Sequence, residues 1–458
     1  MKRLHAAVSA RVAAPARGFT LIELMVAIAL GLLVSLGLVT LFGATSKTSR
    51  IQNAMAQMQE NGRFAVQRMN YDLRMASRQL VNVNGFSQGA TGSNGVVGWS
   101  NAPEVFITTL PFPDMVTPLG KPTGWSNAAT QWWPLSPRYF FQGYECSTGP
   151  CSPTEPASSG AKLNIPAAGT SLGSRVPNSD VAVMRYLVGD GLSMLGGDFT
   201  VDCGGTAGIV TLTLSAAAAA STNIASNDLV MVTSSSFSGI FQVTKAGAVL
   251  TPSSIINSSF VPCVGSSTGQ VEATLFNFSR NFVTVAYWLQ LTADPNDATH
   301  LIPSLYRTQA DNTGTAATPQ ELVQGVEQMD FLYGVQDVNG AVSYATASQM
   351  SIGPNALTCS NAPSQYQPPA GQLPATPEAG CLWRSIKSVE AHLLVNSVTN
   401  MYDLGYADLA YRYNSGYSTT MVFDGLSAPP ATMPSGLPFG RVLRREFVAF
   451  SAQRNYNP

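Results

Sequence analysis

The sequence predicts an α+β protein in which one long N-terminal helix packs on an antiparallel β-rich globular domain. The helix is predicted by an uncharged apolar run between Glu23 and Lys47 and by the amphipathic pattern that follows it. The β-rich domain is predicted because, beyond about Gly85, β-branched and aromatic runs are separated by Gly, Pro, Asn and Ser. The regular strand and helix alternation of a parallel α/β fold is missing, so helix and sheets are expected as separate parts.

Length and composition exclude several classes of protein. The chain has 458 residues, of which 11% are charged and 45% apolar, and its formal net charge is -1. A nucleic-acid partner is not expected, because phosphate contacts need clustered Lys and Arg. The apolar content is too high for a disordered chain. The only histidines are His5, His300 and His392, which leaves few candidates for acid and base catalysis.

The first element is a basic leader, residues 1–18. It contains no acidic residue, and its four basic residues are expected to remain on the cytoplasmic side of a membrane. Removal of the leader changes the formal charge of the chain from -1 to -5. The four basic residues are Lys2, Arg3, Arg11 and Arg17.

The second element is a helix predicted over residues 19–82. Its first half, about 24–44, is long enough to cross a hydrocarbon layer of about 30 Å, and it is longer than the 7–15-residue apolar core of a secretory signal. An isolated carboxylate in such a span costs about 2.5–3.5 kcal/mol, so Glu23 is expected to be functional. Beyond the span, apolar residues recur at helical spacing, which predicts a face that packs on the globular domain. They are Ile51, Met55, Met58, Ala65, Met69, Leu73, Ala76 and Leu80.

A six-residue string before the apolar run resembles the class III signal of type IV pilins and pseudopilins. It consists of Gly18, Phe19, Thr20, Leu21, Ile22 and Glu23. The resemblance implies cleavage by a prepilin peptidase after Gly18, methylation of the new amino terminus on Phe19, and a helix that anchors the chain before it becomes filament core. Glu23 would pair with the terminal ammonium of a neighbouring Phe19 and fix axial register. The alternative is a plain signal anchor with an incidental glutamate.

Small residues at four-residue spacing lie within the span. Ala27, Gly31 and Ser35 share one helical face, where a second helix can approach closely. Composition alone also produces this spacing, so it is compatible with helix bundling and no more. No proline occurs between Pro15 and Pro103, whereas many major pilins carry a helix-kinking proline in this span.

The third element is the β-rich domain, residues 83–458. Its middle, about 85–270, is rich in Ala, Ser, Gly and Thr and is expected to be an elaboration of one globular domain. The predicted strands are Val105–Thr109, Asp180–Val188, Gly208–Leu214, Leu229–Thr233, Ile240–Lys245, Val271–Phe276, Phe282–Leu291, Val326–Val335, Ser388–Val395 and Val442–Phe450.

Segments on the C-terminal side resemble the PilW-like minor pilins. They are Leu305-Tyr306-Arg307, Glu321–Val335 and Arg444-Arg445-Glu446-Phe447. The resemblance implies a minor pilin that helps initiate, prime or cap a type IV pilus by helix packing with other pilins. Its partners would be other minor and major pilins, the prepilin peptidase, the inner-membrane assembly platform and, before assembly, membrane lipid. The chain would be a single-pass protein of the bacterial inner membrane with its C-terminal domain in the periplasm, and later part of the pilus at the cell surface.

Two other functions stay open. A large pseudopilin of a type II secretion system shares the leader, the long helix and the β-rich head. An adhesin or hydrolase that borrows the pilin signal is different in class.

Six cysteines follow the span, on the side expected to be oxidising. They are Cys146, Cys151, Cys203, Cys263, Cys359 and Cys381. Neighbour pairing is favoured because each pair brackets a loop-like stretch, with free thiols or mixed pairing as the alternative. Zinc is not expected, since no C-x-x-C occurs and the histidines lack ligand spacing.

The remaining motifs favour neither catalysis nor metal binding. Gly265–Gly269 matches G-x-S-x-G, but it lies in a Ser, Thr and Gly-rich loop with no helix pattern behind it. Asp294–Asp297 and Asp337–Gly340 offer oxygen ligands yet match turns better than a calcium loop. His392 lies in a predicted strand. We therefore expect a protein that is not an enzyme and binds no cofactor.

One aromatic segment has two interpretations. Gln131–Tyr144 contains six aromatic residues and turn-forming prolines. Buried packing under a long loop is the default, whereas exposed rings would be anchors for a neighbouring subunit.

Overall fold

A computed structural model describes most of the chain and shows a long helix followed by a β-rich region. The described residues are 18, 20–76, 103–113, 119–120, 133–135, 140–146, 151–153, 162–202, 210–234, 238–253, 273–294, 300–336, 339–350, 382–383, 386–401, 404–405, 411–413, 421–422 and 441–453. They form two compact units, residues 1–54 and residues 55–458.

Helix α1 (Leu21–Met75) is 55 residues long and contains no proline. Its start is set by Thr20, whose hydroxyl oxygen accepts the backbone N–H of Glu23 at 3.3 Å, as an N-cap does. An acidic residue in the first turn and Arg74 in the last turn both complement the helix dipole. The helix predicted over 19–82 is thus observed over 21–75, and residues 77–82 lie outside the described residues.

The first unit contains the apolar half of α1. Its most apolar window of 18 residues has no buried part, and by length and composition it is able to cross a membrane. The large apolar side chains from Leu21 to Phe42 are all exposed, for example Leu32 at 66% and Phe42 at 73%. A helix that is apolar on every side needs lipid or other helices around it.

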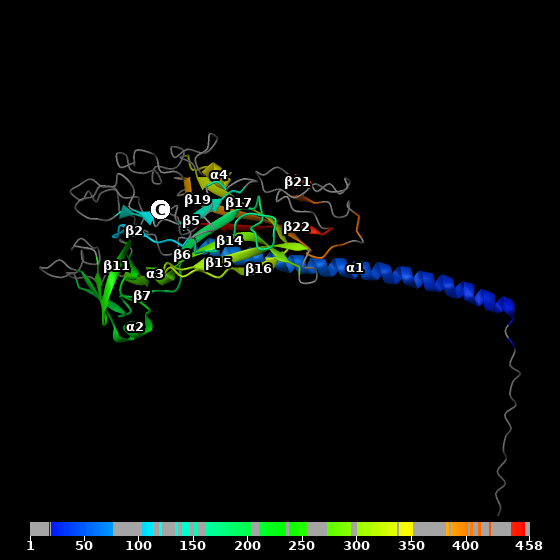
Figure 1. The fold of residues 1–458 in the computed structure, drawn as a ribbon, viewed down its shortest axis with the longest axis horizontal. Helices are drawn as coiled ribbons and strands as arrows, with labels where there is room; N and C mark the ends of the chain where they lie inside the picture. The colour runs from blue at the N-terminus through cyan, green and yellow to red at the C-terminus, as the bar shows by residue number, and fades with distance from the viewer. Residues whose placement is uncertain are drawn as a thin grey trace, which may run out of the picture. The chain divides into compact units, whose positions relative to one another are not determined.

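The second unit contains two antiparallel sheets that share a core with the second half of α1. The five-stranded sheet has the order β16 (Gln320–Gln324), β15 (Leu301–Ala310), β14 (Phe282–Ala293), β6 (Val181–Leu187), β5 (Phe141–Tyr144). The four-stranded sheet has the order β18 (Val342–Ala345), β17 (Val326–Gln336), β19 (Ile386–Asn396), β22 (Arg444–Ala452). Figure 1 shows β14, β15 and β16 beside the second half of α1.

A third, nine-stranded sheet is built mainly from the middle of the chain. Its order is β7 (Leu192–Ser193), β13 (Ala273–Asn277), β10 (Leu229–Ser234), β11 (Ser238–Ala246), β12 (Val249–Pro252), β9 (Thr211–Leu214), β8 (Phe199–Asp202), with β1 (Glu104–Val105) and β4 (Trp133–Pro134) beside β11. Only β1 and β11 pair in parallel among the strand pairs described. This sheet has hydrophobic clusters of its own, so the expected elaboration has a core separate from that under α1.

The small elements complete the described fold. They are the strand pairs β2 (Thr109–Leu110) with β3 (Leu119–Gly120) and β20 (Arg412–Tyr413) with β21 (Met421–Val422), and the short helices α2 (Ala216–Ser221), α3 (Phe278–Asn281) and α4 (Ala347–Met350).

Strands occur at every predicted position, and the α+β class is confirmed. Val105–Thr109 contributes to two short strands, β1 and β2, instead of one continuous strand. The longest strand that the sequence did not predict is β15, because Pro303 interrupts its pattern. In the structure the carbonyl of Pro303 accepts the backbone N–H of Gly325, where β16 ends.

Candidate assembly site

The signal segment lies at the start of α1. Gly18 is exposed, and no atom lies within 4 Å of the place where a Cβ would stand. Phe19 lies outside the described residues. Glu23 is exposed in the first turn of α1, so its carboxylate is open to a partner.

The small residues of the span also lie on an exposed face. Ala27, Gly31 and Ser35 are all exposed, and a Cβ on Gly31 would meet nothing within 4 Å. The hydroxyl of Ser35 donates to the carbonyl oxygen of Gly31 at 2.7 Å. A second helix that packs here therefore meets no unsatisfied hydroxyl.

The second half of α1 packs through the predicted stripe. Met58, Ala65, Met69, Leu73 and Ala76 are between 0% and 3% exposed and belong to the core shared with both sheets. Met55 differs from the prediction, since its side chain is 42% exposed. Leu80 lies outside the described residues.

Asp72 joins α1 to the five-stranded sheet. It is fully buried, and Nε of Arg307 on β15 donates to its Oδ2 at 2.7 Å while an NH2 group of Arg307 donates to Oδ1 at 3.3 Å. The hydroxyl of Tyr186 donates to Oδ1 at 2.6 Å, and that of Tyr287 donates to Oδ2. None of the sequence patterns above marks Asp72 as a site residue, although a lone acidic residue between the apolar positions of a helical stripe is a signal that could have marked it.

The electrostatics of this cluster follow from burial. Burial raises the pKa of both Tyr186 and Tyr287, and the charge of Asp72 raises each further. Burial alone would lower the pKa of Arg307, but the hydrogen bond and charge of Asp72 raise it. Arg307 therefore stays charged, and removing either partner leaves a buried charge uncompensated.

A second buried ion pair links strands of the four-stranded sheet. Nε of Arg444 on β22 donates to Glu327 on β17 at 2.6 Å, and Asn396 on β19 donates to the same carboxylate at 2.8 Å. Arg307, Glu327 and Arg444 all belong to the segments that resemble PilW-like pilins. These segments therefore contribute a buried charge that joins α1 to the five-stranded sheet and a buried pair that joins β22 to β17.

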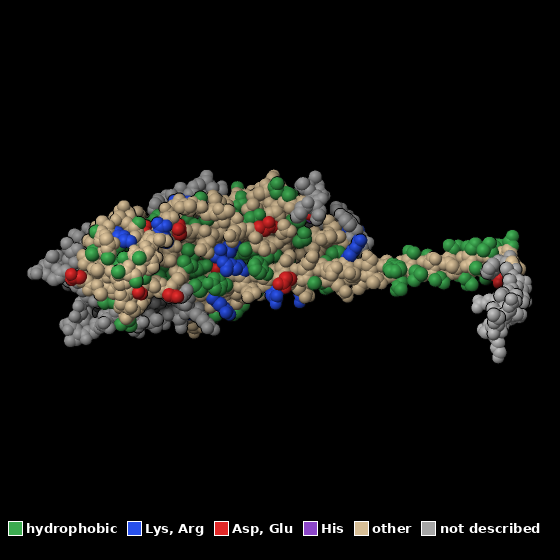
Figure 2. Space-filling view, turned by 90° about the horizontal axis from the view of Figure 1, so that it is seen from below, with side chains coloured by type: hydrophobic (Ala, Val, Ile, Leu, Met, Phe, Trp, Pro, Cys, Tyr) green, Lys and Arg blue, Asp and Glu red, His purple; other side chains and the backbone are tan. Residues whose placement is uncertain are grey.

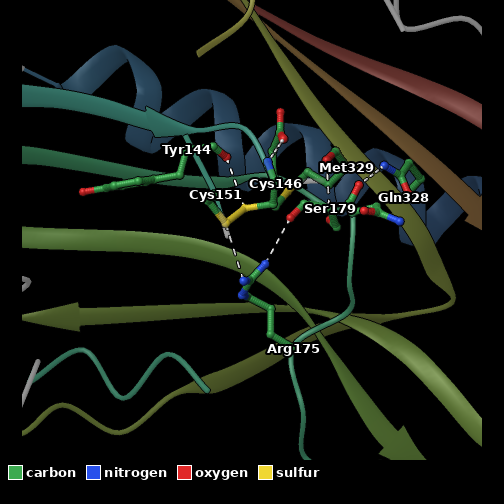
Figure 3. Close-up of a disulfide and its surroundings, with 9 residues drawn as sticks. Tyr144, Cys146, Cys151, Arg175, Ser179, Gln328 and Met329 are labelled. Carbon is green, nitrogen blue, oxygen red and sulfur yellow. Dashed lines mark hydrogen bonds between the residues drawn. A yellow bond between two sulfur atoms is a disulfide. The ribbon is translucent and has the colours of Figure 1, made fainter. Parts of the chain in front are cut away.

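The disulfide lies beside the buried side chain of Arg175 (Figure 3). Cys146 and Cys151 are bonded, and Arg175 donates to the sulfur of Cys151 at 3.5 Å and to the carbonyl of Ser179 at 3.4 Å. This bond agrees with neighbour pairing. The other four predicted disulfide cysteines lie outside the described residues: Cys203, Cys263, Cys359 and Cys381.

Asp180, which is buried, and Asp330, which is partly buried, form an acidic pair. Asp180 accepts the backbone N–H groups of Cys146 at 3.2 Å and Phe331 at 2.9 Å, whereas Asp330 accepts the hydroxyl of Tyr413 at 2.7 Å. Burial raises the pKa of Asp180 well above its usual value, and the charge of Asp330 adds to this. Burial raises the pKa of Asp330 to about 6, although Tyr413 opposes the rise.

The two histidines among the described residues have carboxylate partners. His392 lies on β19 with Nδ1 2.6 Å from Glu446, and His300 has Nδ1 3.2 Å from Asp294. Burial alone would lower the pKa of His392, but Glu446 and Glu390 raise it. Gly265–Gly269 and most of the two Asp-containing turns lie outside the described residues. Within the described ranges, no three His, Cys, Asp or Glu residues are placed to hold a metal ion.

The aromatic segment is packed inside the second unit where it is described. Trp133, Phe140, Phe141 and Tyr144 are at most 7% exposed. Phe141 and Tyr333 meet edge to face at 5.6 Å between ring centroids. The default interpretation, buried packing, therefore holds for these four rings.

A capped apolar helix with an exposed acid in its first turn, followed by antiparallel sheets, is a pilin-like arrangement. Comparison with known families agrees with this arrangement. Residues 14–39 match the prokaryotic N-terminal methylation motif, and residues 287–448 match PilW, the type IV pilus-assembly protein W. In these two regions the chain is similar to PilW-like prepilins. No curated protein and no solved structure matches the chain.

Proposed function

We propose that the mature chain is a minor pilin that helps initiate, prime or cap a type IV pilus by packing its helix among those of other pilins. The observation that carries this proposal is the first half of α1, which is apolar and exposed on all sides and starts at an exposed Glu23. Such a surface is stable only in lipid or among other helices. The match to a pilus-assembly family supports the second environment as the final one.

Processing is proposed to occur at the exposed Gly18. A prepilin peptidase cuts after Gly18, and the new amino terminus on Phe19 is methylated. The helix then begins within two residues of the terminus, because Thr20 caps it. Glu23 pairs with the terminal ammonium of a neighbouring subunit, which fixes axial register.

The proposed location changes during assembly. The chain is first a single-pass protein of the inner membrane with its β-rich part in the periplasm, and then a subunit of the pilus at the cell surface. Its partners are other pilins, the prepilin peptidase, the assembly platform and membrane lipid. We propose no catalytic role, cofactor, metal or nucleic-acid partner.

Processing is tested with Gly18→Ala in the full chain. Blotting is expected to show a precursor that keeps its leader, and piliation is expected to fall. Mass spectrometry of the mature wild-type chain is expected to find methylated Phe19 at its amino terminus. Normal processing and piliation in the variant would contradict the proposal.

The role of Glu23 is tested with Glu23→Val. The variant is expected to insert in the membrane, because the apolar run is unchanged, but to enter filaments poorly, because the charge pairing is lost. Membrane fractions and sheared pili are compared by blotting. Undiminished incorporation would count against the pairing.

A type II secretion pseudopilin remains the alternative to a pilus subunit. A strain that lacks this chain is scored in parallel for surface pili, twitching and secreted proteins. Loss of pili and twitching with normal secretion supports the proposal. A secretion defect with normal pili would replace it with the pseudopilin.

A further inference from the structure

We propose that the outer side of the second half of α1 is a docking surface for an acidic patch on the globular domain of a different pilin subunit. The surface, here the aromatic stripe, consists of Phe64, Arg68 and Tyr71. This inference rests on the proposed function, because the function makes pilins the neighbours of this chain. It names a part of the helix that packing in the membrane span does not involve.

The three side chains share one face of the helix. They are four and three residues apart, a spacing that places side chains one above another. The core positions Met69 and Leu73 lie on the other side, at 0% exposure. The stripe is therefore out of phase with the face that binds the sheets.

The stripe contains two large rings that stay exposed beside the described part of the second unit. Phe64 is 47% exposed and Tyr71 is 53% exposed. The guanidinium carbon of Arg68 lies 5.4 Å from the centroid of the Tyr71 ring, and its Nε lies 3.8 Å from Oδ2 of Asp72. Arg68 is thus held in place between a ring and a carboxylate before any partner binds. Aromatic and arginine side chains in fixed positions are typical of interface hot spots.

Charge defines the chemistry of the partner. Between residues 55 and 75, three arginines accompany two acids, Glu60 and Asp72, and Asp72 is already neutralised by Arg307. The side of α1 away from the sheets is therefore basic, although the chain without its leader has a formal charge of -5. On the face of the second unit seen in Figure 2, Lys and Arg side chains lie beside hydrophobic ones, with Asp and Glu side chains among them. An apolar surface flanked by carboxylates complements such a stripe.

The test uses the full chain in cells that make pili. A photo-crosslinking amino acid replaces Phe64 or Tyr71 in turn, and Leu172, which is 62% exposed, is replaced as a matched control. Irradiation is expected to join positions 64 and 71, and not position 172, to another class III prepilin product. Mass spectrometry identifies the linked peptide, which is expected to come from an acidic part of that protein's globular domain.

A second test changes the charge at an exposed position, so that loss of the adduct cannot be attributed to loss of folding. Gln67 is exposed between the two rings. Gln67→Glu is expected to reduce the adduct from position 71 several-fold, whereas Gln67→Lys is expected to retain it. Both substitutions keep a good helix former, so neither disturbs α1.

Three results would overturn the inference. They are the absence of an adduct from positions 64 and 71, an adduct with lipid or with a second copy of this chain, and equal adducts in the two Gln67 variants. If the chain still enters sheared pili, only the docking surface is wrong. If its deletion leaves pili unchanged, the proposed function itself has failed.

Discussion

The two halves of α1 use their carboxylates in opposite ways. In the first half, Glu23 is exposed at the start of an apolar helix that no sheet covers. In the second half, Asp72 is fully buried against Arg307 and two tyrosine hydroxyls of the five-stranded sheet. One carboxylate is open to another chain, and the other has its partners within this chain. The difference teaches that one continuous helix exposes a carboxylate in one segment and buries a carboxylate against the sheets of its own chain in another.

The largest expected effect comes from Asp72→Ala. The variant leaves Arg307 buried without its partner, and loss of one member of a buried pair costs about 3–5 kcal/mol. We expect the free energy of unfolding of the full chain in detergent to fall by about this amount, measured by denaturant unfolding. Glu23→Val, at the other end of the helix, is expected to leave this free energy unchanged.

The control for this change is a double variant. Asp72→Leu with Arg307→Met removes both charges and is expected to lose less stability than Asp72→Ala. If the double variant is as unstable as the single one, the packing of the region and not the buried charge decides its stability.

The second effect concerns Asp330, whose carboxyl group has no arginine as close to it as Arg307 is to Asp72. Burial raises the pKa of Asp330 to about 6 in the folded chain, from an ordinary value of 3.8. A raised carboxyl pKa gives stability that is complete below about pH 4 and is lost as the pH rises through 6. At about 1.4 kcal/mol per pKa unit, the loss is on the order of 3 kcal/mol.

Asp330→Asn tests this dependence. The free energy of unfolding of the wild-type chain is expected to fall between pH 4 and pH 6.5, and that of the variant is expected to fall less. Asp180 also has a raised pKa and acts in the same direction, so some slope remains in the variant. The raised pKa of His392 acts above this pH range, because its ordinary value is already 6.5. Identical slopes in the two proteins would contradict the assignment to Asp330.

The third effect compares glycines in the two halves of α1. A Cβ on Gly62 would overlap the ring of Phe447 on β22, whereas a Cβ on Gly37 would meet nothing within 4 Å. Gly62→Ala is expected to destabilise the chain by about 1–3 kcal/mol, because the ring must move. Gly37→Ala is expected to be neutral or slightly stabilising, because alanine favours the helix. Thermal unfolding of both variants measures the difference.

Much of this contrast is predictable from the sequence. The uncharged run after Glu23 predicts the exposed apolar half, and the stripe from Met58 to Ala76 predicts the buried face. Most of the longer strands are predictable because runs of β-branched and aromatic residues are separated by turn-forming residues. The strand β15 is not predictable, because Pro303 interrupts its pattern. Whether a strand continues through this proline depends on the neighbouring backbone, where the N–H of Gly325 donates to the carbonyl oxygen of Pro303.

The candidate site is predictable only where its signal is local. Gly18 and Glu23 lie within one short string, so a linear pattern finds them. The partner of Asp72 lies 235 positions away on β15, and only the folded sheet brings Arg307 to it. Phe64 and Tyr71 are also missed, because their exposure depends on which face of α1 the sheets cover.

The smallest expected effect comes from Glu60, a third carboxylate on α1. Its Oε2 accepts a hydrogen bond from Arg63 at 3.0 Å, but the two side chains are 66% and 75% exposed. Water and salt screen such a pair, so Glu60→Gln is expected to change the free energy of unfolding by less than about 0.5 kcal/mol. Denaturant unfolding beside Asp72→Ala checks the ranking. If Glu60→Gln lowered the free energy of unfolding as much as Asp72→Ala, burial would not be what decides how much these carboxylates contribute to stability.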